Sequence, residues 1–389
     1  PGNPLVVSSV GDGTTQQGEV LEGFCEAVRS SLPVFFLIHD NKLAISVRTG
    51  GKTIFSDKNH APLSLETRYV DGTDVAACAS VFREGVEFIR QTGKPIAVVM
   101  ECERLCNHTN ADKQAVYRSE SEITEAGTHD PIAALRRRLL EEGKAEDELA
   151  ALEEKVAADV KAAALAVIQD PPGKYVASAF LDRPKETKTI RVRANGADGE
   201  TVMVQALNRV MGYYLEHDDR TFLYGQDIED PKGDVFGTTK GLSTRFPGRV
   251  VNSPLTESTI VGACAGRAMA GQRPVAFVQF ADFMPLALNQ IISELSTMSW
   301  RTLGKFNCPM VIVASSGAYR PGLGPFHGQT MDGYLCHTPG IEVVFPSNAA
   351  DAAGLMISAI ESPNPTVYLY PKSLLNDPVS ASPLGEEIQ

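Results

Sequence analysis

The sequence has 389 residues, of which 43% are apolar and 22% are charged, and its formal net charge is −12. This acidic balance argues against nucleic acid or an anionic membrane surface as the main partner. No apolar run reaches the roughly 18 residues that a membrane-spanning helix needs, and no signal peptide is recognisable. The seven cysteines are scattered along the chain. We therefore expect a cytoplasmic protein with reduced thiols.

The first part of the chain alternates short apolar runs with longer amphipathic segments. Residues 4–10 and 33–39 are rich in β-branched or aromatic residues and are bounded by turn residues, which predicts two buried strands. Residues 17–31 between them are expected to form a helix. A second helix over 73–92 and a further strand over 95–101 follow. Strand, helix and strand in this order indicate a parallel sheet.

Residues 130–168 are predicted to be helical, because Asp130 and Pro131 are a favourable N-cap and first helical residue. Apolar side chains continue this segment at helical spacing, at Leu149, Leu152, Val156, Val160 and Ala163. The stretch that follows is rich in proline, glycine and charge, which predicts a linker. We assign a first domain to residues 1–180, the linker to 181–200, a second domain to 201–375 and a tail to 376–389.

A second α/β module is predicted after the linker. Helices are expected over 200–216 and over 256–270, where small residues favour close packing. Short apolar runs predict strands at 221–225, 274–280, 309–315, 341–345 and 366–370. The predicted fold class is therefore α/β, with two modules of mainly parallel sheet flanked by helices.

Polar residues follow the first two strands, where a parallel sheet binds ligands. Asp12 lies after the first strand and Asn41 after the second, so both are expected in one crevice at the carboxyl edge of the sheet. Gly11 and Gly13 would let the backbone turn tightly, and the helix that follows would offer free N–H groups to an anion. One carboxylate, one carboxamide and a loop carbonyl suit Mg²⁺ bound with phosphate oxygens. The sequence therefore predicts a magnesium-diphosphate site.

Simpler interpretations of these residues remain open at this point. The Gly11–Gly13 segment could be an ordinary tight turn, and Asp40-Asn41 a turn at a strand end. Cys102, Cys106 and His108 lie close together in the sequence, but no second pair completes a zinc site. A dinucleotide-binding site is disfavoured, because "GDGTTQ" lacks the GxGxxG pattern.

The spacing of GDG, then 26 residues, then Asp40-Asn41 resembles the fingerprint of thiamine-diphosphate enzymes. That fingerprint usually ends in Asn-Asn, so Asn41 matches the metal-binding asparagine, whereas Asp40 departs from the pattern. The resemblance implies thiamine diphosphate as the cofactor and Mg²⁺ as the metal. The implied metal ligands are Asp12, Asn41 and the backbone carbonyl of Leu43. The implied cofactor contacts are Gly11, Asp12, Gly13, Asn41, Leu43, Ile45, Glu257 and Phe283.

Longer segments resemble the E1 components of 2-oxoacid dehydrogenases. "RYVDGTDVAA" and "ERLCNHTNADKQAVYRSESEI" are similar to the α component, and "NSPLTESTIVGACAGRAMAGQRP" and "PFHGQTMDGYLCHTPGIEVVFPS" to the β component. The chain thus looks like both components fused, and we expect it to lack a region that family members carry at each end. In this family the cofactor binds between a diphosphate-binding and a pyrimidine-binding module, so a homo-oligomer is expected.

The same resemblance implies the reaction and its partners. An E1 component oxidatively decarboxylates a 2-oxo acid and passes the acyl group to the lipoyl group of a dihydrolipoyl acyltransferase, the E2 component. Branched-chain 2-oxo acids and pyruvate are the candidate substrates, and "RYVDG" and "FADF" favour the branched-chain group. A transketolase-like enzyme without a lipoyl partner and a non-catalytic remnant of the fold remain the alternatives.

Three side chains match catalytic residues of the family. Glu257 matches the glutamate that hydrogen-bonds N1′ of the aminopyrimidine, and His108 and His327 match two histidines that move protons during acyl transfer. Phe280 and Phe283 match an aromatic wall around the substrate, and Gln279 is a polar neighbour of that wall. Without the family context, Glu257 would be interpreted as a helix N-terminal residue and each histidine as a structural or surface residue.

The loop that carries His108 also matches the family. Thr109 corresponds to a hydroxyl that is phosphorylated in some family members. Its loop residues Arg104, Asp112, Tyr117 and Arg118 match as well, whereas Asn107 and Lys113 depart from the commonest pattern.

Overall fold

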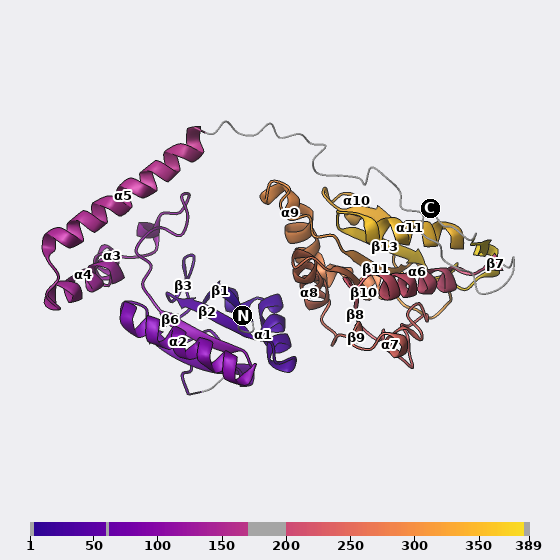
Figure 1. Ribbon diagram of the computed structural model, residues 1–389, viewed down its shortest axis with the longest axis horizontal. Coiled ribbons are helices and arrows are strands. Elements are labelled where there is room, and N and C mark those ends of the chain that lie inside the picture. The colour runs from indigo at the N-terminus through magenta and orange to yellow at the C-terminus, as the bar shows by residue number, and fades with distance from the viewer. Residues whose placement is uncertain (1–3, 60–61, 170–199, 385–389) are drawn as a thin grey trace. The chain divides into compact units, whose positions relative to one another are not determined.

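The computed structural model describes residues 4–59, 62–169 and 200–384. They form two compact units, the first within Pro1–Gly173 and the second within Lys174–Gln389. Each unit has a parallel sheet flanked by helices, which confirms the predicted fold class (Figure 1). The expected linker over 181–200 lies outside the described residues, apart from its last residue. In the part of the chain that is described, no helix is long and apolar enough to cross a membrane.

The sheet of the first unit has four parallel strands in the order β1-β2-β6-β5. Their bounds are Val6–Gly11 for β1, Val34–Asp40 for β2, Ile96–Glu101 for β6 and Glu66–Asp71 for β5. Strand β5 was not predicted, because its only buried side chain is Val70 and it carries no apolar run. The other three strands lie where the sequence predicted them.

Helices cover both faces of this sheet. Helix α1 (Gly18–Arg29) packs on one face, where the rings of Phe24 and Phe36 meet edge to face at 4.7 Å. Helix α2 (Val75–Thr92) packs on the other face through Cys78 and Ile89. With helices on both faces, the loops at the carboxyl edge of the sheet remain available for a ligand.

The rest of the first unit is a hairpin, short 3₁₀ turns and three helices. The hairpin pairs β3 (Leu43–Ala44) with β4 (Val47–Arg48), and the 3₁₀ turns are η1 (Thr14–Gln16), η2 (Pro62–Ser64) and η3 (Gln114–Val116). The helices are α3 (Glu120–Thr128), α4 (Pro131–Glu141) and α5 (Glu146–Gln169). As predicted, Asp130 caps α4, since its side chain accepts the Ile132 N–H at 2.8 Å.

The single helix expected over 130–168 is in fact two helices. The chain leaves the helical conformation between α4 and α5, where Gly143 has φ 88°. Of the apolar positions predicted along α5, Leu149 is buried, whereas Leu152, Val156 and Val160 are exposed. Their helical spacing was predicted correctly, but it does not mark a face packed against the first unit's core.

The sheet of the second unit has six parallel strands in the order β12-β13-β11-β10-β8-β9. Their bounds are Glu342–Val344 for β12, Thr366–Pro371 for β13, Val311–Ser316 for β11, Arg273–Phe280 for β10, Thr221–Gly225 for β8 and Val250–Asn252 for β9. Strand β9 was not predicted, because its apolar run is only Val250 and Val251, between Arg249 and Asn252. A small antiparallel pair joins β7 (Glu200–Thr201) to β14 (Ser382–Pro383).

Side chains of this sheet alternate between two cores. On β10, Val275 and Phe277 face the core that contains α6 (Met203–His217) and α11 (Ala349–Glu361). Ala276 and Val278 face the core that contains α8 (Glu257–Met269). The remaining elements are α7 (Leu242–Arg245), η5 (Ala281–Ala287), the π-helical η6 (Asn289–Leu295), α9 (Ser296–Arg301), α10 (Asp332–Cys336) and η7 (Pro378–Ser380).

Candidate active site

Asp12 lies at the carboxyl edge of the first sheet, directly after β1. Its backbone N–H donates to the carbonyl of His39 at 3.0 Å, which fixes it beside the end of β2. The side chain is 3% exposed, and the hydroxyl of Thr49 donates to its carboxylate. Its carboxylate forms no ion pair with any residue of the described ranges, and a buried carboxylate of this kind is suited to hold a metal ion.

Asn41 and Leu43 provide two further oxygen atoms after β2, the strand that pairs with β1. The Asn41 carboxamide oxygen accepts the Leu43 N–H at 3.0 Å, which folds the segment after β2 back on itself. In the hairpin, the Thr49 N–H donates to the Lys42 carbonyl at 3.0 Å. Hydrogen-bonded and non-hydrogen-bonded pairs alternate along an antiparallel hairpin. The next pair, Leu43 with Arg48, is therefore a non-hydrogen-bonded pair, and the Leu43 carbonyl points away from the partner strand.

Gly13 is required by a close approach of the backbone, whereas Gly11 is not. A Cβ atom on Gly13 would lie 2.6 Å from the Cβ of Ala44 in the hairpin, while one on Gly11 would have its nearest contact at 3.9 Å. The chain turns at Asp12 and Gly13, as predicted, but neither glycine has a positive φ, so the backbone conformation of the turn does not itself require glycine. The helix predicted over 17–31 is α1, which begins at Gly18, and the short turn η1 separates its first N–H groups from Gly13.

The first unit therefore offers a donor set that fits Mg²⁺. It consists of one carboxylate, one carboxamide oxygen and one backbone carbonyl, which are hard oxygen donors and leave room for phosphate oxygens. Asp40 is not included in this set, because it departs from the fingerprint, and its carboxylate accepts the Lys42 N–H at 3.0 Å. Burial raises the pKa of Asp40, and the nearby charge of Asp12 adds to that effect. Within 4–59, 62–169 and 200–384, no three His, Cys, Asp or Glu side chains form a metal cluster.

His108 lies on an exposed loop that is held by a chain of hydrogen bonds. The backbone N–H of His108 donates to the Asp112 carboxylate at 2.8 Å, and the same carboxylate accepts the Tyr117 hydroxyl at 2.6 Å. Arg104 donates to the same hydroxyl at 2.6 Å and, through its other terminal nitrogen, to the Ile45 carbonyl at 2.6 Å. These two hydrogen bonds hold the pKa of Asp112 below its usual value, and the bond from Tyr117 has the larger effect. The loop is thereby tied to the hairpin that carries Leu43.

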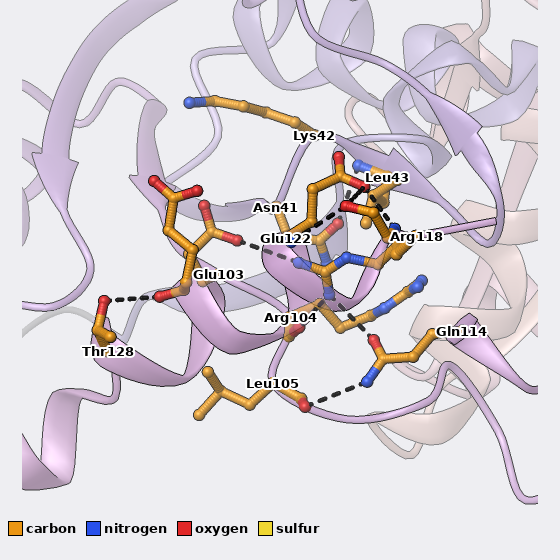
Figure 2. Close-up of polar contacts among 12 residues, drawn as sticks. Asn41, Lys42, Leu43, Glu103, Arg104, Leu105, Gln114, Arg118, Glu122 and Thr128 are labelled. Atoms are coloured by element: carbon orange, nitrogen blue, oxygen red, sulfur yellow. Dashed lines mark hydrogen bonds and ion pairs between the residues drawn. The ribbon is translucent and has the colours of Figure 1, made fainter. Parts of the chain in front are cut away.

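A buried arginine fixes the base of the same loop. Arg118 is 6% exposed and donates to the Arg104 carbonyl at 2.7 Å and to Gln114 at 3.0 Å. Figure 2 shows Gln114 between Arg118 and Leu105, whose carbonyl accepts the Gln114 amide at 3.4 Å. Asn107, which departs from the family pattern, contributes by accepting the Gln114 N–H at 3.0 Å. Sequence analysis missed Gln114, since a lone glutamine gives no chemical signal.

Glu257 is the first residue of α8 and lies at the carboxyl edge of the second sheet. Its side chain is 8% exposed and accepts the amide of Gln226 at 3.2 Å, through Oε1. Gln226 follows β8, and its own carbonyl accepts the amide of Gln279 at the end of β10. Sequence analysis missed Gln226, although it follows a strand as Asp12 does. The carboxylate is thus buried and fixed through Oε1, and Oε2 has no hydrogen-bond partner among the residues that the structure describes.

His327 lies on the loop after β11, against two aromatic rings. The imidazole meets Phe280 edge to face at 4.8 Å and Phe283 at 5.5 Å. Its carbonyl accepts the ammonium of Lys372 at 2.7 Å, a residue that sequence analysis also missed. The second unit therefore brings His327, Phe280 and Phe283 together, as expected. His108 and the metal donors belong to the first unit.

Both units are similar to known protein families. Residues 3–174 match the family model described as the dehydrogenase E1 component, and residues 200–378 match that of the transketolase pyrimidine binding domain. The two matches follow one another as the sequence predicted, and the resemblance to thiamine-diphosphate-dependent 2-oxoacid dehydrogenase E1 components is confirmed. Both regions imply thiamine diphosphate as the cofactor.

Curated relatives resemble about half of the chain. The 2-oxoisovalerate dehydrogenase subunit beta 2, mitochondrial, of Arabidopsis thaliana is 39% identical over 183 residues, which cover 46% of this chain and 50% of that protein. The 2-oxoisovalerate dehydrogenase subunit beta of Bacillus subtilis is 38% identical over 43% of this chain and 51% of its own length. The pyruvate dehydrogenase E1 component subunit beta of Mycoplasma genitalium is 34% identical over 44% and 52%. The chain thus spans about half the length of these relatives.

Proposed function

Because residues 3–174 belong to the dehydrogenase E1 component family and residues 200–378 to the transketolase pyrimidine-binding family, we propose that this chain supplies the active-site residues of a 2-oxoacid dehydrogenase E1 component. The proposed reaction is the oxidative decarboxylation of a 2-oxo acid, with transfer of the acyl group to the lipoyl group of a dihydrolipoyl acyltransferase E2. We keep the domain bounds proposed from the sequence, a homo-oligomeric assembly and a cytoplasmic location.

The observation that carries this proposal is the environment of Glu257. A carboxylate at a helix start would usually face water, but this one is 8% exposed and bonded to Gln226. Gln226 donates to Oε1, so Oε2 would hold the proton shared with N1′ of the cofactor's pyrimidine ring. Bound thiamine diphosphate would supply the carbon nucleophile and the electron sink for decarboxylation. Without such a ligand, one oxygen of the buried Glu257 carboxylate would lack a hydrogen-bond partner, which would lower the stability of the protein.

The first unit would hold the diphosphate end of the cofactor. Asp12, Asn41 and the Leu43 carbonyl are the proposed Mg²⁺ ligands, since they combine one buried carboxylate with two neutral oxygens. The close contact of Gly13 with the hairpin brings its backbone beside these ligands. Gly11, Gly13 and Ile45 are proposed to contact the cofactor through their backbone.

His327 and His108 are proposed to move protons during acyl transfer to the lipoyl group. Histidine is the side chain that most often serves as a general acid or base, because one ring nitrogen can accept a proton and later return it. Phe280 and Phe283 would exclude water from the ring of His327 and provide an apolar wall for the substrate side chain. Phe283 is also the proposed cofactor contact of the second unit.

The substrate is proposed to be a branched-chain 2-oxo acid, with pyruvate as the alternative. The aromatic wall continues from Phe280 to Phe236, whose rings lie 6.1 Å apart, and on to Tyr319 at 5.7 Å. A continuous apolar wall favours a larger side chain, because each added methylene contributes about 1–3 kcal/mol of discrimination. Relatives named for 2-oxoisovalerate and for pyruvate both match the chain at 34–39% identity.

The first test is thermal unfolding of the chain, and of the complete gene product, with thiamine diphosphate and either Mg²⁺ or EDTA. At about 100 times its Kd the cofactor should stabilise the folded state by roughly 2.7 kcal/mol. Asp12→Ala should abolish the Mg²⁺-dependent shift, and Asp147→Ala, at an exposed position of α5, should retain it.

The second test measures carbon dioxide release from 2-oxoisovalerate and from pyruvate, with and without a lipoyl domain. Decarboxylation and lipoyl acylation that both disappear in Glu257→Gln would support the proposal. Decarboxylation with no acyl transfer to any lipoyl domain would favour a transketolase-like enzyme. Absence of both cofactor binding and turnover in the complete gene product would overturn the proposal.

A further inference from the structure

The backbone at His327 and at the next two residues is held by a buried lysine, Lys372, and a half-buried aspartate, Asp282. The ammonium of Lys372 donates to the His327 carbonyl at 2.7 Å. One oxygen of Asp282 accepts the next two backbone N–H groups, those of Gly328 at 3.1 Å and Gln329 at 3.0 Å. The lysine therefore binds the backbone carbonyl of His327, and the aspartate binds the backbone N–H groups of the next two residues. Together they fix three consecutive residues of the loop.

The loop needs such an anchor, because it has no regular structure of its own. Residues 317–331 contain neither helix nor strand. Three of their glycines, Gly317, Gly322 and Gly324, have positive φ values of 78°, 88° and 64°. Glycines in this region allow many backbone conformations, so the loop gains little order from local preference. A histidine on such a loop would keep one orientation only if its backbone were fixed from outside.

Lys372 is built into the sheet and not free on the surface. It follows β13, its N–H donates to the Ser316 carbonyl at 3.1 Å, and the residue is 4% exposed. Its ammonium also lies 4.6 Å from the centre of the Phe280 ring, the same ring that the imidazole of His327 meets. Burial lowers the pKa of Lys372, and the charge of Asp282 opposes that effect. A lysine held this way couples Phe280 and His327 to the rigid end of the sheet.

Asp282 holds the loop at the two residues that follow His327. It lies in the first turn of η5, directly between Phe280 and Phe283 in the sequence. Its second carboxylate oxygen is buried and has no hydrogen-bond partner among the residues that the structure describes. Burying a carboxylate is costly unless a charge compensates it, and Lys372 supplies that charge nearby. The opposite charges of the two side chains therefore partly compensate each other.

We propose that Lys372 and Asp282 are positioning residues that fix the ring of His327 against Phe280 and Phe283. The role of His327 in this inference rests on the proposed function. The anchoring of the loop by the two side chains does not depend on that function. Neither side chain is proposed to touch substrate or cofactor. Their effect on turnover would pass through the orientation of the imidazole, which must lie within a fraction of an ångström of its working position.

Hydrogen exchange of the complete gene product tests the anchoring directly. Lys372→Met removes the donor and keeps the apolar stem, and Asp282→Ala removes the acceptor. Each should speed amide exchange in residues 323–331 by about tenfold or more, with α6 unchanged. Lys372→Arg should restore slow exchange, and Lys240→Met, at an exposed lysine of the same unit, should have no effect. Unchanged exchange in residues 323–331 of both variants, or an equal increase throughout the unit, would overturn the proposal.

Steady-state kinetics distinguishes a positioning role from a general loss of stability in the second unit. Lys372→Met should lower kcat for acyl transfer about tenfold or more and leave the KM for the 2-oxo acid unchanged, and Lys372→Arg should recover most of the loss. Equal loss in Lys372→Arg and Lys372→Met would count against a positioning role. If the unsubstituted protein turns over no 2-oxo acid, the proposed function fails, while the exchange experiment still decides whether Lys372 and Asp282 hold the loop.

Discussion

Gln226 and Glu257 share a buried hydrogen bond of 3.2 Å that joins the end of β8 to the first turn of α8. The two residues are 31 positions apart in the chain. Gln226 is itself held from β10, because Gln279 donates to its backbone carbonyl and the Ser315 hydroxyl donates to the Gln279 carbonyl at 2.6 Å. Three strand ends are thereby connected beneath one carboxylate, which makes Gln226 the residue that sets the direction of Glu257.

Removing the Gln226 amide should weaken both stability and activity. In Gln226→Leu the Oε1 atom of Glu257 stays buried without its donor, which should lower the free energy of unfolding by roughly 1–3 kcal/mol. The carboxylate would also lose its fixed direction, so kcat should fall while cofactor binding persists. Urea denaturation and turnover of a 2-oxo acid measure the two effects. Gln205→Leu, at an exposed position of α6, is the matched control. Equal stability of the two variants would contradict the prediction.

Gly13 should not tolerate even a methyl group. Its added Cβ would lie 2.6 Å from the Cβ of Ala44, so the hairpin that carries Leu43 must shift. We expect Gly13→Ala to lower the free energy of unfolding by about 1–3 kcal/mol and to weaken Mg²⁺-dependent cofactor binding. Gly23→Ala is the control, since its Cβ would meet nothing within 4 Å inside α1 and should stabilise the protein by about 0.5–1 kcal/mol. Similar stability changes in both variants would disprove the steric explanation.

The strand ends of the site could be predicted from the sequence, because an apolar run that stops at a polar residue is visible directly. Asp12 and Asn41 were found in this way, and the structure places both at one edge of the first sheet. Gln226 and Lys372 obey the same rule after β8 and β13, but neither residue type signals a particular chemistry. Their importance comes from partners 31 and 45 positions away. Such pairings depend on the folded sheet and leave no local pattern.

The elements of the fold that were missed or wrongly joined also have physical reasons. Strand β5 begins with Glu66, Thr67 and Arg68, so its position in the sheet is decided by pairing with β6 and not by apolar content. The break between α4 and α5 depends on Gly143, whose φ of 88° ends a helix. An isolated glycine in a helical pattern is compatible with continuation as well, so its conformation is known only from the structure.

The loop that carries His108 should lose order in acid. Hydrogen bonds from the Tyr117 hydroxyl and the His108 N–H hold the pKa of Asp112 below its usual value of 3.8. A carboxylate with a lowered folded-state pKa stabilises the loop fully above the unfolded-state pKa, and this contribution is lost as pH falls through the folded-state pKa. Protection factors of residues 104–118 should therefore stay constant down to about pH 4 and then decrease.

Two variants separate this carboxylate from other acidic groups. Asp112→Asn should lack the step in protection below about pH 4, and Tyr117→Phe should lower protection already at pH 7, because the hydroxyl that joins Arg104 to Asp112 is gone. Hydrogen exchange corrected for the intrinsic rate at each pH is the measurement. The same acid step in Asp112→Asn would show that another group controls the loop.

Negative charge at Thr109 should loosen the same loop. Thr109 is exposed, and its backbone carbonyl accepts the Asp112 N–H at 3.1 Å, so a charged side chain there would lie near the Asp112 carboxylate. Thr109→Glu should lower the protection of residues 104–118 by electrostatic repulsion, and Thr109→Gln, of the same size, should not. About 1 M salt should reduce the difference, since it shortens the screening length to about 3 Å.

The functional consequence of this charge should appear in acyl transfer more than in decarboxylation. His108 is proposed to move protons at the lipoyl step, and its N–H is bonded to Asp112, so a loosened loop would displace it. Acylation of a lipoyl domain should therefore fall in Thr109→Glu while carbon dioxide release with an artificial electron acceptor is retained. Equal loss of both activities, or equal loss in Thr109→Gln, would mean that the size of the side chain matters and its charge does not. Phosphorylation of Thr109 would act in the same direction, because phosphate adds up to about two negative charges at pH 7.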